Sequence, residues 1–174
     1  MKLHRVALGL VLLILVPAVA TAGYKANVTA PAGFADGLSR VAIVTSECGE
    51  GLDCRNVEQQ VRVVLTRMAP GFQIVGGVHE ALLSLGAVDY STDLRQKLAD
   101  KLKVDALLEL TLPKGEKGVF GWKGSEATVR LQLVKPTGEI LMAGEGTGRA
   151  RNTLSSPENI ARTTAERILK KAFR

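Results

Sequence analysis

The spacing of apolar residues predicts alternating strands and helices from residue 40 onward. Residues 41–44 form a short apolar run of the kind that a buried strand shows. An apolar stripe at helical spacing follows and consists of Val57, Val61, Val64, Leu65 and Met68. Residues 72–75 form a second short apolar run. Strand, helix and strand in this order predict a parallel pair joined by a right-handed crossover.

The ends of the expected helices have sequence signals of their own. Asn56 is the expected N-cap of the first helix. A short helix is expected over 78–85, and another that begins at Ser91 or the residue after it. A last helix is expected to open with Ser156 as its cap and Pro157 at its first helical position.

The segment between these helices predicts antiparallel strands. Alternate apolar residues share one face over 105–112 and again over 128–134. The turn sequence 136–138 then leads into a return strand over 139–151. This last strand has glycines at positions 144, 146 and 148, which indicate a bulge or bend where bulky side chains would not fit.

These elements predict an α/β fold with a single mixed sheet of about five strands, covered by helices. The sheet is expected to start as a parallel βαβ unit and to contain an antiparallel hairpin near the C-terminus. The predicted domain covers residues 40–174. Residues 23–39 mix Gly, Ala, Pro, Asn and Asp without periodicity, so they are expected to form a flexible leader.

Residues 1–22 have the pattern of a secretory signal peptide. Lys2 and Arg5 give a basic start, residues 6–16 are apolar, and small residues over 18–22 fit a cleavage site. The alternative is an uncleaved anchor, but the apolar run is shorter than the roughly 20 residues of a spanning helix. The first cysteine is Cys48, so no lipid-attachment cysteine follows the apolar run. We expect a soluble periplasmic or secreted protein.

Composition narrows the expected partners. The chain has 174 residues and a formal net charge of +6, and removal of Lys2 and Arg5 with the leader would leave +4. This modest basic excess favours peripheral contact with an anionic membrane, a cell-wall polymer or an acidic partner. No nucleic-acid motif accompanies it, so nucleic acid is not an expected partner.

Cys48 and Cys54 are the only cysteines. In an exported protein two cysteines this close predict a local disulfide, which shapes the loop between them. The alternatives are a redox pair, which more commonly has the C-x-x-C spacing, and a metal site, which needs more ligands than this loop offers.

The search for reactive groups gives little support to an enzyme. The glycine-rich segments do not match the dinucleotide or P-loop fingerprints. The only histidine after the leader is His79, beside Glu80 at the start of a short expected helix. No catalytic residue, metal site or cofactor is therefore expected. The alternative is an envelope enzyme or small-ligand binder that uses His79 and polar residues near the strand ends.

The segment 114–124 is the expected partner-binding element. It joins two strands that two residues could have joined, and it contains Phe120 and Trp122 among glycines and lysines, including Lys117 and Lys123. Exposed aromatic residues on a long loop favour docking to a protein or a membrane surface. Alternatively, the two rings fold back over the sheet and cover an edge or a gap in the core.

The order of elements resembles a bacterial envelope superfamily. The resemblance rests on three short segments, residues 41–44, 103–108 and 129–140. It extends over about residues 40–173. The superfamily includes the amino-terminal domain of TolB, the curli secretion lipoprotein CsgG and the penicillin-binding-protein activator LpoB. The resemblance implies a helix-covered sheet that acts in the periplasm or at the outer membrane, without catalytic residues.

The resulting functional hypothesis is a non-enzymatic periplasmic envelope protein. It would act as an assembly, scaffolding or regulatory module that binds another envelope protein of unknown identity. One alternative is the His79 enzyme or ligand binder described above. The other is a subunit of a ring-like secretion assembly, which would make the protein a homo-oligomer.

Overall fold

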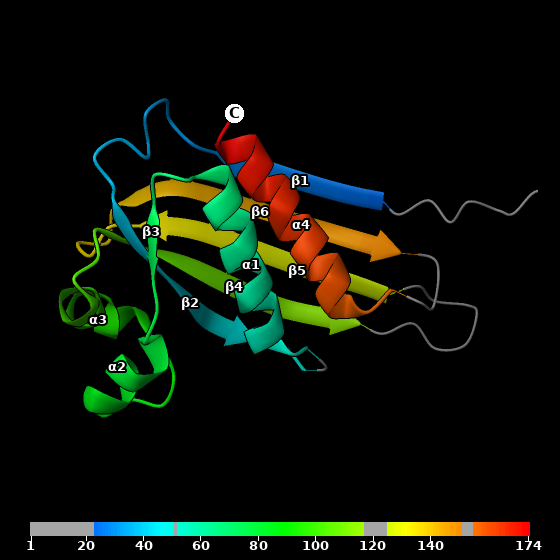
Figure 1. Ribbon diagram of the computed structural model, residues 1–174. Helices are drawn as coiled ribbons and strands as arrows, with labels where there is room; N and C mark the ends of the chain where they lie inside the picture. Colours follow the sequence, from blue (N-terminus) through cyan, green and yellow to red (C-terminus); the bar gives the residue numbers. More distant parts are fainter. Residues whose placement is uncertain (1–22, 51, 117–124, 151–154) are drawn as a thin grey trace, which may run out of the picture.

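The computed structural model describes residues 23–50, 52–116, 125–150 and 155–174. It contains one open sheet of six strands in the order β1-β6-β5-β4-β2-β3 (Figure 1). The strands are β1 (Gly23–Thr29), β2 (Arg40–Cys48), β3 (Gln73–Val75), β4 (Ala106–Glu116), β5 (Ser125–Val134) and β6 (Ile140–Ala150). The α-helices are α1 (Cys54–Met68), α2 (Val78–Ser84), α3 (Arg95–Leu102) and α4 (Pro157–Ala172), and a 3₁₀ turn, Thr92–Leu94, precedes α3.

The predicted fold class is confirmed. β2 pairs in parallel with both β3 and β4, which is the expected βαβ start. β4, β5 and β6 pair antiparallel, and the turn between β5 and β6 closes with a 2.9 Å hydrogen bond from the Gly138 amide to the Lys135 carbonyl. Gly138 has a φ of 95°, which a residue with a Cβ rarely adopts. The predicted mixed sheet is therefore present.

The prediction for residues 23–39 differs from the structure. Residues 23–29 form β1, which pairs antiparallel with β6 over the register Gly23↔Arg149 to Thr29↔Ala143. The sheet consequently has six strands instead of about five, and its first strand lies in the segment expected to be a flexible leader. Only the loop that follows β1 is irregular, and it leads across to β2. The expected signal peptide, residues 1–22, lies outside the described residues.

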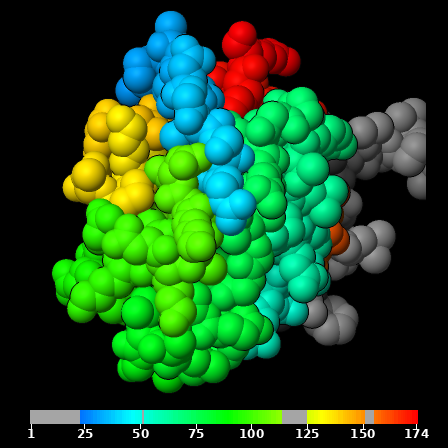
Figure 2. All heavy atoms as spheres, turned by 60° about the vertical axis from the view of Figure 1, so that its left-hand side comes forward, coloured from blue at the N-terminus to red at the C-terminus, as the bar shows by residue number. Residues whose placement is uncertain are grey.

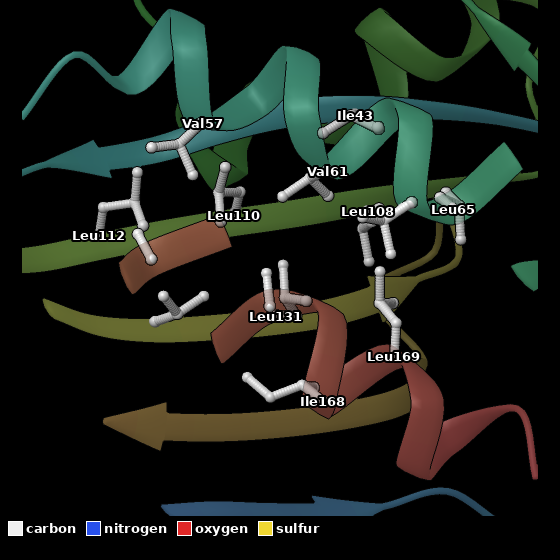
Figure 3. Packing of buried hydrophobic residues seen from close by; sticks show 14 of the residues in the cluster. Ile43, Val57, Val61, Leu65, Leu108, Leu110, Leu112, Leu131, Ile168 and Leu169 are labelled. Carbon is white, nitrogen blue, oxygen red and sulfur yellow. The ribbon is translucent and has the colours of Figure 1, made fainter. Parts of the chain in front are cut away.

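One face of the sheet is covered by α1 and α4, which lie side by side (Figure 1). Figure 3 shows Val57, Val61 and Leu65 of α1 pointing toward Leu108 and Leu110 of β4. All five side chains are buried, and they belong to a cluster that extends to β6 through α4. The apolar stripe of α1 thus packs against the apolar positions of the strands beneath it.

Three glycines let α4 approach β6 closely. A Cβ at Gly144 would lie 2.2 Å from Ile168 Cγ2, and one at Gly148 would lie 2.6 Å from Ile160 Cγ2. A Cβ at Gly146 would lie 2.7 Å from Thr164 Cγ2. The prediction that bulky side chains would not fit here is correct, but the expected bulge is absent from these positions. Along β5–β6 the register shifts between Leu133 and Val134 instead.

The opposite face of the sheet is covered only in part. α2 and α3 pack on β2 and β4, where their cluster includes Ala42, Val44 and Leu107. Over β5, β6 and β1 the same face presents side chains that are exposed or half-buried and, except for Ala143, polar; it is here called the open face. It comprises Lys25, Asn27, Thr29, Glu126, Thr128, Arg130, Gln132, Ala143, Glu145, Thr147 and Arg149.

Candidate functional site

The main pocket lies where the chain connections diverge at the carboxyl end of β2. The connection from β2 to β3 runs through α1 on one face, and the connection from β3 to β4 runs through α2 and α3 on the other. In open α/β sheets a crevice forms at such a point, outside the carboxyl ends of the strands. The pocket here has a volume of about 670 Å³.

Four segments form the walls of this pocket. They are the end of β2, the first two turns of α1, the first turns of α2, and the loop that follows α2. The polar residues among them are Thr45, Ser46, Glu47, Arg55, Glu58, Gln59, His79, Asp89 and Tyr90. Val78 and Leu82 supply apolar lining from α2. The pocket is accordingly a mixed surface with polar walls.

The predicted disulfide forms one wall of the pocket. Cys48 is the last residue of β2, and Cys54 is the first residue of α1. Their sulfur atoms lie 2.00 Å apart, and the Cα atoms are 6.0 Å apart. The bond therefore ties the end of the strand to the start of the helix and restricts the loop between them. No cysteine is free among the described residues.

The start of α1 differs from the prediction in its cap. Asp53, not Asn56, is the N-cap: an Asp53 side-chain oxygen accepts a 3.1 Å hydrogen bond from the Asn56 backbone N–H. The helix begins three residues earlier than an N-cap at Asn56 would place it. Arg55 and Glu58 both belong to the first two turns of this helix, and both line the pocket. The predicted cap of α4 is correct, because the Ser156 side chain accepts from the Asn159 N–H.

Carboxylates outnumber basic groups in the pocket, which we call the acidic pocket. Glu47, Glu58 and Asp89 line it, and Arg55 is the one lysine or arginine among its lining residues. Thr45 Oγ1 donates a 2.9 Å hydrogen bond to Glu58 Oε2, which fixes that carboxylate at the wall. The side chains of Glu47 and Asp89 are exposed and have no hydrogen bond or ion pair within the described part of the chain. The acidic pocket therefore favours a positively charged occupant.

His79 lies at the pocket rather than on an unrelated surface. It is exposed in the first turn of α2, near Val78 and Leu82 in the lining. Within the described ranges its side chain forms no hydrogen bond or ion pair. Its position agrees with the alternative in which His79 and polar residues at a strand end bind a small ligand.

Beneath one wall of the pocket lies a buried charged cluster that the sequence did not indicate. Glu109 of β4 is 6% exposed, and its Oε1 accepts from Arg95 Nε at 2.8 Å and from the Tyr90 hydroxyl. Burial, and after it the hydrogen bond to Glu109, raises the pKa of Tyr90 well above its usual range. The hydrogen bond to Glu109 also raises the pKa of Arg95. Together these contacts fix the loop after α2 to the sheet.

The predicted partner-binding residues cannot be compared with this site. Lys117, Phe120, Trp122 and Lys123 all lie outside the described residues. Among the residues described, no three His, Cys, Asp or Glu side chains gather in a way that would bind a metal ion. Nor does any helix in the described ranges have the length and apolar character needed to cross a membrane.

Sequence reasoning found two parts of the site and missed the rest. It identified the disulfide and named His79 with polar residues near the strand ends. It did not identify Glu47, Glu58 and Asp89 as neighbours, because they come from a strand, a helix and a loop. The one available signal was general: polar residues directly after a buried strand often line a crevice.

The sequence matches no protein-family model and no curated protein. Solved structures do match. The PelC dodecamer from Paraburkholderia phytofirmans aligns with a TM-score of 0.62 and 12% identity, over 84% of this chain and 95% of that chain. Lipoprotein GNA1162 from Neisseria meningitidis aligns with a TM-score of 0.49 and 16% identity, over 67% of this chain and 88% of that chain.

LpoB from E. coli aligns with a TM-score of 0.48 and 19% identity. That alignment covers 65% of this chain and 57% of LpoB. At such identities a likeness concerns the fold, and the PelC alignment is the more extensive of these. The described chain therefore has a fold similar to that of PelC.

Proposed function

We propose that this chain is a non-enzymatic protein of the bacterial envelope that acts by binding other proteins, and that copies of itself are among its partners. One observation supports self-association above all: the fold is similar over 95% of a PelC chain, and PelC is a dodecamer. The role is that of an assembly, scaffolding or regulatory module. The proposal includes membership of the TolB, CsgG and LpoB superfamily.

The open face supports a role in protein contact. Its side chains are short hydroxyl and amide groups and charged groups that pair with each other, such as Arg149 with Glu126 at 2.7 Å. Thr128 and Thr147 also lie within hydrogen-bond distance, at 3.3 Å between their hydroxyl oxygens. Polar side chains can contribute to an interface through direct hydrogen bonds and bridging waters. No helix of the described residues covers the open face, which thus offers room for a neighbouring protein.

Mass in solution tests the self-association. Native mass spectrometry and light scattering of the purified, oxidised protein are expected to give a mass several times that of one chain. The mass should fall on dilution toward that of the monomer, since association follows mass action. A monomer at every concentration tested would refute self-association.

Location and partner binding need a second experiment. In cells that make the protein from its own gene, fractionation is expected to place it in the envelope, with residues 1–22 removed. Crosslinking in intact cells, followed by mass spectrometry, should recover either copies of this chain or a specific envelope protein. A cytoplasmic, unprocessed protein would contradict the envelope role.

A second candidate function is the binding of a small cation, because the acidic pocket brings His79 together with three carboxylates. The probe is spermidine, whose methylene chain and amines match an apolar lining with acidic walls. Spermidine should raise the melting temperature of the wild-type protein, and Glu47→Gln with Asp89→Asn should abolish that rise. An equal rise in both proteins would rule out this pocket as the binding site.

A further inference from the structure

The helices α1 and α4 run in the same direction, so that the two ends of their layer differ. Near the start of both helices, the Asp53 backbone N–H lies 3.4 Å from Glu158 Oε1. Near their ends, Arg67 lies 2.9 Å from Glu166. In Figure 1 the start of α1 lies at the lower side and the C-terminus at the upper side. Since α1 has 15 residues, these ends are separated by roughly 22 Å.

The starting end of this layer adjoins the acidic pocket. Glu47 and Asp89 are exposed there, and neither has a partner in the part of the chain that the structure describes. Glu50, also exposed, and the cap Asp53 lie in the disulfide loop beside the pocket. With Arg55 as the one lysine or arginine in the pocket lining, carboxylates outnumber basic groups among the described residues at this end.

The opposite end is positively charged, and we call it the basic end. Its residues are Arg67, Arg167, Lys170, Lys171 and Arg174. Glu166 is the carboxylate that pairs with them in the described residues, with Lys170 at 2.8 Å and Arg67 at 2.9 Å. Those basic groups, led by Lys170, lower the pKa of Glu166. In Figure 2 the C-terminal residues, in red, lie at the top of the molecule, and the green helical segments lie at the bottom.

The other contacts of the basic end leave its positive charges without a carboxylate partner. The Arg167 guanidinium lies over the Tyr24 ring at 4.5 Å, and Lys171 Nζ donates to the Ala26 carbonyl at 2.9 Å. Neither contact neutralises a positive charge. Arg174 is exposed and forms no hydrogen bond or ion pair with the described residues. The basic end thus has several cations and one paired carboxylate.

Helix dipoles explain only part of this charge separation. Cations near the C-terminus of α4 are favourable because they complement its dipole. Glu47 belongs to β2, and Asp89 belongs to the loop after α2, so neither is in the first turn of a helix. An occupant of opposite charge at the pocket would contact both carboxylates.

We propose that the acidic pocket binds the basic end of α4 from a second copy of this chain, so that copies associate head to tail. This inference rests on the self-association in the proposed function and names its surfaces. A pocket of about 670 Å³ is large enough for one or two long basic side chains. Their methylene groups would contact Val78 and Leu82, and their charged groups would reach Glu47 and Asp89.

The geometry of this contact suits a ring. Head-to-tail interfaces use two different surfaces, and they form a closed ring when the rotation between copies divides a full turn. A ring of twelve, the number in the PelC dodecamer, needs a rotation of about 30° per copy. The two surfaces must then lie far apart on each copy, and the acidic pocket and the basic end lie at opposite ends of α1.

Charge reversal at each surface tests the inference. One variant combines Glu47→Lys with Asp89→Lys, and the other combines Lys170→Glu with Arg174→Glu. For each variant alone, the protein concentration at which half of the chains are assembled should be about tenfold higher than for the wild type. The reason is that like charges then meet at the contact. A mixture of the two variants should assemble as well as the wild type, since each reversed surface meets an opposite charge.

The matched control is Lys97→Glu with Lys101→Glu on α3, which changes net charge by the same amount as the basic-end variant. It should assemble like the wild type, and circular dichroism should show all variants folded. If the wild type assembles but the reversals have no effect, or the mixture fails to recover, the interface is wrong while self-association stands. A monomeric wild type would instead refute the self-association on which the interface rests.

Discussion

The two faces of the sheet differ in how far helices cover the side chains of the strands. Under α1 and α4 every second residue of β4 and β5 is apolar and buried, from Ala106 to Leu112 and from Ala127 to Leu133. On the other face of β4, Leu107 is followed by Glu109 and then Thr111. Arg95 of α3 and Tyr90 cover Glu109, which is 6% exposed, whereas Thr111 is half-buried. Among the described helices, coverage of this face thus ends along β4, and the side chains of β5, β6 and β1 beyond it form the open face.

The largest expected effect comes from adding a side chain on the covered face. Gly146→Val would place a Cβ 2.7 Å from Thr164 Cγ2 and 2.8 Å from the Lys25 carbonyl oxygen. The helix and β1 would have to move, so we expect the free energy of unfolding to fall by about 3 kcal/mol. Urea denaturation of the purified protein measures this change.

The control for that variant is Ala143→Val on the open face of the same strand. Its side chain is half-buried and has no helix above it, so the change should stay within about 0.5 kcal/mol. Equal losses for the two variants would mean that the faces do not differ in packing as described.

A smaller loss is expected from the charged cluster beneath α3. Glu109→Leu removes the acceptor shared by Arg95 and Tyr90 and leaves both donors without it. We expect a loss of about 2 kcal/mol in the free energy of unfolding. Glu109→Gln keeps an acceptor oxygen and should lose less. If Glu109→Leu matched the wild type, the cluster would contribute nothing to holding α3 on the sheet.

The raised pKa of Tyr90 predicts a loss of stability in alkali. The folded state retains the hydroxyl proton at a pH where the unfolded chain, with a pKa of about 10, releases it. This contribution is fully present below about pH 10 and falls as the pH rises further, by up to about 1.4 kcal/mol per pH unit. Unfolding measured across this range should show a shallower decline for Tyr90→Phe. Identical pH profiles would contradict a buried, hydrogen-bonded Tyr90.

The smallest effect is expected from an ion pair on the open face. Arg130 and Glu145 lie 3.4 Å apart, and their side chains are 51% and 56% exposed. Water screens such a pair, so a double-mutant cycle with alanine should give a coupling energy below about 0.5 kcal/mol. A coupling energy as large as the loss of unfolding free energy expected for Glu109→Leu would show that solvent does not screen this pair.

Much of the fold followed from local pattern. Some elements have sequence signals that are contained within a few residues. Examples are the apolar run 41–44, the alternating segment 128–134 and the Ser156-Pro157 start of α4. β1 was missed because its sequence includes Gly23, Lys25 and Asn27, which are uncommon in strands. The alternation of Tyr24, Ala26 and Val28 was the available signal.

The site was harder to predict because its parts are distant in sequence. Glu109 belongs to an alternating strand, and that pattern does not reveal that Arg95 and Tyr90 lie over it. The acidic pocket similarly depends on the helices α1 and α2 lying on opposite faces of β2. Sequence pattern gives the face of each residue, whereas tertiary packing decides which residues meet.

The pairing of β1 with β6 also bears on the order of folding. Gly23 pairs with Arg149, so the strand that is synthesised first binds one that is synthesised much later. Contacts between such distant segments close a long loop of chain and slow the folding reaction. The outer strand must therefore remain unpaired until most of the polypeptide has emerged, which leaves an interval in which a chaperone could hold the chain extended.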